Sequence, residues 1–113
     1  MSNTLKNNIE AIESGYEYLL AYAAQGRERD DGTEARSMLQ SMRDAAAGIA
    51  SELANDDDDF SEVVVEDARK SGAAIRLVIG QDRISSEIVD NLNASIHLRA
   101  LLTDLFLLSE TIG

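Results

Sequence analysis

Carboxylates recur at helical spacing in two parts of the sequence. The two groups are Glu10, Glu13 and Glu17, and then Glu62, Glu66 and Asp67. Residues three and four positions apart lie on one side of a helix, so most of these carboxylates point in a common direction within their group. Hard oxygen ligands of this kind suit Mg²⁺, which proteins bind through a few carboxylates together with substrate phosphates. The chemistry that such carboxylates could support is the binding of a divalent metal ion.

The first group has a parallel in a known class of enzymes. Glu10-x-x-Glu13 is similar to the Glu-x-x-Glu motif of all-helical nucleotide pyrophosphatases, in which it faces a Glu-x-x-Asp motif. The resemblance implies that Glu10, Glu13, Glu62 and Glu66 are magnesium ligands. The second group departs from the pattern because it lacks a Glu-x-x-Asp. A solvated acidic helix face is the alternative that we favour, since 21 Asp and Glu among 113 residues produce such spacings by chance.

His97 is the single histidine of the chain. No carboxylate stands three or four residues from it, which excludes the Glu-x-x-His pair of a di-metal bundle. The segment Leu98–Thr103 resembles part of the phosphoacceptor helix of sensor histidine kinases, but the histidine of that family would fall at Ile96 and its proline is absent. Phosphotransfer by His97 is therefore our third hypothesis, and a structural or surface histidine is the simpler interpretation.

Four consecutive aspartates, Asp56–Asp59, precede a helical pattern. An EF-hand loop counted from Asp56 requires glycine at its sixth position and glutamate at its twelfth, where this chain has Ser61 and Asp67. The run is therefore not an EF-hand. We interpret it as a loop that ends at a helix N-terminus, where carboxylates are stabilised by the helix dipole. A docking surface for a basic partner is the functional alternative.

The composition narrows the function classes. The net charge of −11 repels phosphate backbones and anionic lipid surfaces, so we expect neither nucleic-acid nor membrane binding. The chain has no cysteine, which excludes disulfides and thiolate chemistry, and no motif indicates a cofactor. The start of the chain lacks the basic and apolar stretches of a signal peptide, so we expect a cytoplasmic protein. Our first functional hypothesis places it in bacteria.

Helical periodicity runs through most of the sequence, and there is no proline. The spacing predicts four helices, over about residues 3–26, 33–55, 60–79 and 82–112. The expected helix starts are Asn3 or Thr4, Thr33 and Asp82, and the expected helix ends are Gly26 and Gly80. Residues 27–32 are expected to form a charged turn. The boundary between the last two helices is open, because the apolar spacing crosses it with little change of phase. We expect a single all-α domain over residues 1–113, an antiparallel up-down four-helix bundle.

Two features indicate a binding surface. Residues 98–108 hold seven large apolar side chains, more than one packed side of a helix requires. A second stripe on the first helix consists of Ala11, Gly15, Tyr18 and Tyr22. The predicted binding residues are Tyr18, Tyr22, Leu105 and Phe106. We expect them to form a homodimer interface, with a wide core seam inside the monomer as the alternative.

Our first functional hypothesis is a non-enzymatic interaction or regulatory protein that presents an acidic docking surface to a basic protein partner. The magnesium-dependent nucleotide enzyme is the second hypothesis, and the histidine phosphotransfer module is the third.

Overall fold

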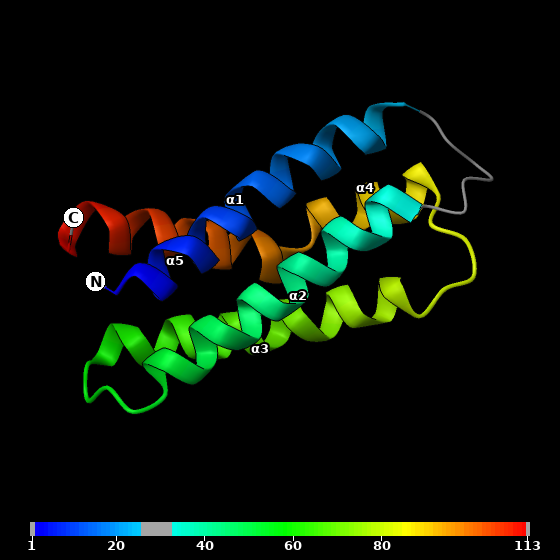
Figure 1. Cartoon of the computed structure of the whole chain (residues 1–113). Helices are drawn as coiled ribbons and strands as arrows, with labels where there is room; N and C mark the ends of the chain where they lie inside the picture. Colours follow the sequence, from blue (N-terminus) through cyan, green and yellow to red (C-terminus); the bar gives the residue numbers. More distant parts are fainter. Residues whose placement is uncertain (1, 26–32, 113) are drawn as a thin grey trace.

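The computed structural model describes residues 2–25 and 33–112, and this part of the chain contains helices and no strand. The five helices are α1 (Asn3–Ala24), α2 (Thr33–Leu53), α3 (Asp59–Ile79), α4 (Ser86–Ala94) and α5 (Ile96–Ile112) (Figure 1). The all-α prediction is confirmed. The prediction of four helices is wrong, because the last rod is divided into α4 and α5.

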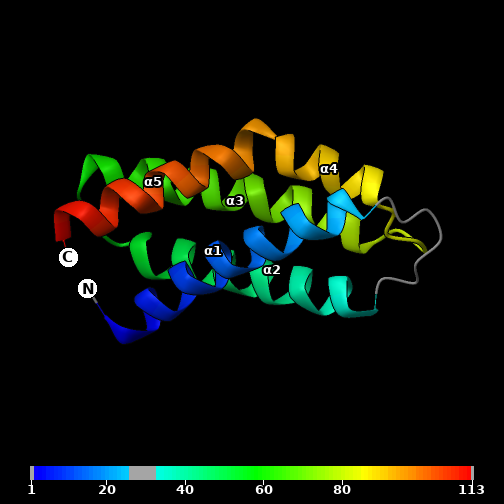
Figure 2. The same cartoon turned by 90° about the horizontal axis from the view of Figure 1, so that it is seen from above.

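The helices run up and down the long axis of a body that measures 45 × 23 × 22 Å. Helix α1 packs against α2 and α4, and α3 packs against α2 and α5, while α1 does not contact α3 (Figures 1 and 2). The rods therefore follow one another around a ring. In this ring the seam between α2 and α3 lies opposite the seam between α1 and α5. The α2–α3 seam has the most extensive contact, and the α1–α5 seam has the least.

Ser95 divides the rod that the periodicity predicted to be continuous. Its ψ of 129° takes the backbone out of the helical region, and its N–H still donates to the carbonyl of Leu92. Its Oγ then accepts a hydrogen bond from the N–H of His97 at 3.3 Å. Serine is a favourable residue for such a site because its side chain replaces the missing backbone partners of a new helix.

Helix starts are capped by side chains at positions close to those expected. Ser2, rather than Asn3 or Thr4, caps α1 by accepting from the N–H of Leu5 at 3.0 Å. Asp58 caps α3, as the position of the aspartate run predicted. Helix α4 is capped by Ser85 and not by Asp82, which lies in the exposed connection.

The predicted helix ends differ in detail. Gly80 closes α3 as expected, with a right-handed φ of −69°. Helix α1 ends at Ala24, so the predicted closure at Gly26 and the predicted turn at residues 27–32 lie outside the described residues. Thr33 begins α2, but its side chain is not among those described.

Polar bonds join the helix ends that meet near the α3–α4 connection. The Tyr22 hydroxyl, in the core, donates to the carbonyl of Ile84, and the Ser86 hydroxyl donates back to the carbonyl of Tyr22 at 2.9 Å. From α2, the guanidinium of Arg36 donates to the carbonyls of Ile79 and Gln81. These bonds hold the end of α1 and the start of α2 against the connection.

Candidate functional site

The seam between α1 and α5 is open along part of its length. A groove of about 500 Å³ lies there, and its lining comes from both helices: Glu10, Glu13, Ser14, Tyr16, Glu17 and Leu20 of α1, and Leu102 and Phe106 of α5. We call it the acidic groove. The groove exists because α1 packs mainly against α2 and α4 and makes little contact with α5.

The floor of the acidic groove is apolar and partly wet. Phe106 is 53% exposed and Leu20 is 47% exposed, whereas Leu102 beside them is buried. Tyr16 is half-buried and packs against the core. Covering these side chains would remove apolar surface from water, which is favourable.

The wall of the acidic groove carries carboxylates. Glu10 and Glu17 are exposed and Glu13 is half-buried, all on one side of α1. Within the described residues, none of the three is part of an ion pair. Seven residues of helix separate the outer two, which corresponds to about 10 Å. The groove therefore combines an apolar floor with a row of unneutralised negative charges.

The four predicted binding residues divide into two kinds. Phe106 lies in the acidic groove. Leu105 is fully buried in the monomer core, and Tyr22 is 2% exposed there. Tyr18 is half-buried, with its ring 6.2 Å from that of Tyr22. Of the four, only Phe106 offers a largely exposed side chain to a partner.

The second stripe of α1 packs inside the molecule for much of its length. Gly15 is buried against the side chain of Met42, where an added Cβ would overlap the methionine. This close approach of α1 to α2 buries the Gly15 part of the stripe inside the molecule. The apolar arc of α5 is likewise mostly covered. Only two of its seven large apolar side chains, Phe106 and Leu107, are exposed.

The two carboxylate groups do not meet. Glu10 and Glu13 line the acidic groove, whereas Glu62 and Glu66 line a hollow between α2 and α3 on the other side of the bundle. Nowhere in residues 2–25 and 33–112 do three or more His, Asp or Glu side chains form a group that could hold a metal ion. The convergence that a magnesium-dependent enzyme requires is not seen among the described residues.

The remaining candidates for chemistry are His97 and the aspartate run. The side chain of His97 is exposed, and its backbone carbonyl accepts a hydrogen bond from Ser71 at 2.9 Å. In the aspartate run, Asp58 caps α3 and Asp56 accepts from the Ser61 hydroxyl at 3.3 Å.

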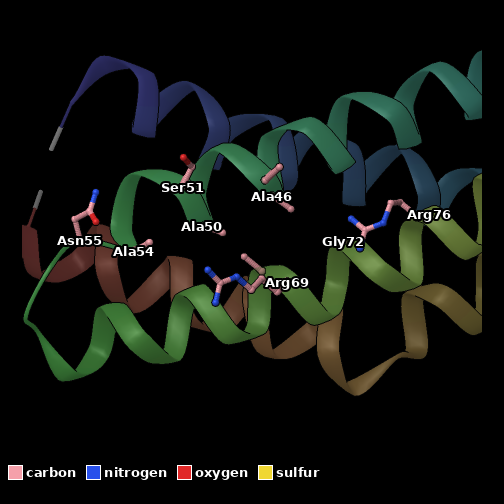
Figure 3. A pocket seen from close by; sticks show the side chains of 10 residues that line it. Ala46, Ala50, Ser51, Ala54, Asn55, Arg69, Gly72 and Arg76 are labelled. Carbon is pink, nitrogen blue, oxygen red and sulfur yellow. The ribbon is translucent and has the colours of Figure 1, made fainter.

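A second groove runs along the outer side of α2 and α3, and we call it the α2–α3 groove. One part, of about 520 Å³, is floored by alanines of α2 and carries Arg69 and Arg76 of α3 (Figure 3). An adjoining part of about 390 Å³ is lined by Glu62 and Glu66, and it shares Ala54 and Arg69 with the first. Both charge types thus occur along one continuous surface.

A carboxyl pair lies between α3 and α5, with Asp104 buried and Asp67 half-buried. Asp104 is 7% exposed, and its Oδ2 has no hydrogen-bond partner among the described residues. Burial, a hydrogen bond with Asp67 and the negative charge of Asp67 raise the pKa of Asp104 to about 7. Below about pH 7 the Asp104 carboxyl is mostly neutral and can donate a hydrogen bond to Asp67.

No protein-family model matches the chain, and no curated protein or solved structure shows significant similarity to it. In the part of the chain that the structure describes, no helix combines the length and the apolar character needed to cross a membrane.

The sequence patterns indicate the three glutamates and Phe106 of the acidic groove. They do not single out Leu20 in that groove, nor Arg69 and Arg76 in the α2–α3 groove. The signal for Leu20 was its position four residues after Tyr16, which places the two on one side of α1. The signal for Arg69 and Arg76 was their spacing of seven residues, two helical turns.

Proposed function

We propose that this protein is a non-enzymatic interaction module that binds a basic amphipathic helix of a partner protein in the acidic groove. The observation that carries the proposal is the combination of exposed Phe106 and Leu20 with the carboxylates Glu10, Glu13 and Glu17 in one hollow. An amphipathic helix supplies what the groove lacks: an apolar stripe for the floor and cations for the wall.

Charge favours this partner over others. The chain carries a net charge of −11, which raises the encounter rate with a cationic segment and lowers it with an anionic one. Lysines or arginines spaced three to four residues apart on the incoming helix match the carboxylate spacing on α1. Apolar contact with the Phe106 ring supplies affinity, because aromatic side chains at the centre of an interface contribute most of its binding energy.

The test uses a fluorescent 18-residue peptide of leucine and lysine, about five helical turns, with its leucines on one helical stripe. Its twin carries glutamate in place of every lysine. Fluorescence anisotropy of the wild-type chain should show saturable binding of the lysine peptide, weakening as salt rises, and no binding of the glutamate twin.

Two groove variants separate the contributions. Glu10→Gln, Glu13→Gln and Glu17→Gln together should weaken binding at least about tenfold and reduce its salt dependence. Phe106→Ala should weaken binding about tenfold while leaving the salt dependence unchanged. The matched control removes three exposed carboxylates elsewhere, with Glu34→Gln, Asp57→Asn and Glu87→Gln, and should bind nearly as well as the wild type.

Equal losses in the groove variant and the control would show that binding depends on net charge alone and would refute the docking site. Unchanged binding in both groove variants would refute it as well.

A further inference from the structure

The outer stripe of α3 has its charges sorted by sign along the helix. The stripe repeats at four and three residues and consists of Glu62, Glu66, Arg69, Ala73 and Arg76, all exposed. Carboxylates occupy its N-terminal half and guanidinium groups its C-terminal half. Within the described residues none of the four charges makes an ion pair. The stripe sums to zero charge in a chain whose net charge is −11.

The α2 side of the same surface is small and uncharged. The exposed residues that line it are Ala47 and Ser51 of α2 and Ala54 and Asn55, which directly follow this helix, and buried Ala46 and Ala50 form its floor. An exposed edge lined by four residues without a charge is unusual in so acidic a chain. Small side chains at this edge let the backbone of another helix approach closely.

The arginines lie in the groove rather than extending away from it. Figure 3 shows both side chains in the space beside α2. Gly72 makes room for Arg76, because a Cβ at residue 72 would lie 3.2 Å from its Nη1. The guanidinium group of Arg76 therefore rests over the bare glycine backbone, directed along the groove.

We propose that a second copy of this chain docks on the α2–α3 groove, with the two α3 helices antiparallel about a two-fold axis near Ala68. Arg69 of each copy then faces Glu66 of the other, and Arg76 faces Glu62. The midpoint of Glu66 and Arg69 lies between residues 67 and 68, and that of Glu62 and Arg76 is residue 69. The two pairings therefore differ in register by three residues, about 4.5 Å along the helix, and an axis midway between the two midpoints leaves each pair offset by about 2 Å, within reach of these long side chains.

The sorted charges select a second copy over other partners. A uniformly acidic helix would meet repulsion at Glu62 and Glu66, and a uniformly basic one at Arg69 and Arg76. A helix whose own charges are sorted in the opposite order complements the whole stripe, and antiparallel α3 presents that order. Such a contact is isologous, so the same patch is used on both copies and the assembly closes at two.

The experiment measures molar mass by sedimentation velocity and light scattering, at about 100 μM chain and about 0.15 M salt so that long-range repulsion between acidic chains is screened. The wild type should be a dimer. Arg69→Glu with Arg76→Glu makes the stripe entirely acidic, and Glu62→Arg with Glu66→Arg makes it entirely basic. Each double variant should dimerise at least about tenfold more weakly than the wild type.

Mixing the two double variants is the decisive step, because every cross-pair then has opposite charges. An equimolar mixture should recover the dimer, and so should a single chain that carries all four substitutions. The substituted residues are exposed, and far-ultraviolet circular dichroism checks that each variant remains helical. Gly72→Leu fills the space under Arg76 and should weaken the dimer without changing helix content.

Three results would overturn the proposal. A wild-type monomer at this concentration would do so, as would double variants that stay dimeric. A mixture that remains monomeric would show that the stripe does not pair with itself. Peptide binding in the acidic groove is measured independently, so its success or failure does not alter this outcome.

Discussion

Replacing Asp104 by asparagine should stabilise the protein at neutral and alkaline pH and leave its stability near pH 4 almost unchanged. In the wild type, burial and the neighbouring Asp67 raise the pKa of Asp104 from 3.8 to about 7. The folded chain therefore binds one more proton than the unfolded chain between these two values. Stability must fall as the pH rises through this interval, because the unfolded state releases the proton more readily.

The size of the effect follows from the shift. One pKa unit corresponds to about 1.4 kcal/mol, so a shift of roughly three units destabilises the folded wild type by at most about 4 kcal/mol once Asp104 is ionised. About 2–3 kcal/mol of this is lost between about pH 5 and pH 8. Asp104 adjoins a surface hollow that is also lined by Arg99 and Thr103. Movement of the ionised Asp104 carboxylate toward this hollow will return part of its hydration and reduce the measured value.

The assay is urea unfolding followed by circular dichroism at about pH 5, 6, 7 and 8. The quantity of interest is the difference in free energy of unfolding between Asp104→Asn and the wild type, because carboxylates that do not interact with Asp104 contribute equally to both. This difference should grow in favour of the variant as pH rises and level off above about pH 7. Asp90→Asn, at an exposed site on α4, should show no such trend.

A pH-independent difference for Asp104→Asn would refute the reasoning, since it would mean that Asp104 does not titrate in this interval. Asp67→Asn gives an independent check, because removing that neighbour's charge should move the titration of Asp104 toward lower pH.

Other predictions concern packing and polar anchors. Arg36→Ala should lower the free energy of unfolding by about 1–3 kcal/mol by leaving carbonyls at the end of α3 without their donors, with Arg36→Lys intermediate. Tyr22→Phe should cost about 1 kcal/mol or more in thermal unfolding, since it leaves the buried carbonyl of Ile84 without its donor. Gly15→Ala should cost about 1–3 kcal/mol by overlap with Met42, and less when Met42 is already alanine.

The helical architecture was predictable because it depends on local periodicity, and the first three helices follow it. The start of α3 was also predictable, since an aspartate directly before an apolar helical pattern is a favourable cap. The break at Ser95 was not. The apolar spacing runs through Leu92 and Ile96 as if one helix continued, yet Ile96 is 74% exposed because the helical phase restarts after Ser95.

The candidate site was predictable only in part for a related reason. Helical spacing identifies which residues share a side of one helix, so the glutamates of α1 emerged as a group. It does not identify which helix lies opposite. Spacing alone therefore pairs Glu62 and Glu66 with Glu10 and Glu13, although the structure places the former pair at the seam between α2 and α3. On α5, apolar side chains lie on several sides of the helix, so the pattern does not show that Leu105 is buried while Phe106, about 100° further around the helix, is exposed.

The positions of the two grooves bear on how the proposed activities combine. Because α1 contacts α2 and α4 but not α3, the acidic groove and the α2–α3 groove lie on opposite sides of the bundle. A dimer formed through the α2–α3 groove therefore leaves both acidic grooves open and directed away from the two-fold axis. Such a dimer is bivalent. A partner with two basic helices can occupy both acidic grooves only if its linker spans the full width of both bundles. Its second helix then binds in an intramolecular step, which strengthens the overall binding. The short sides of the body measure 23 and 22 Å, so that span is about twice this width, and the architecture selects for partners with long linkers or for partners that are themselves dimeric.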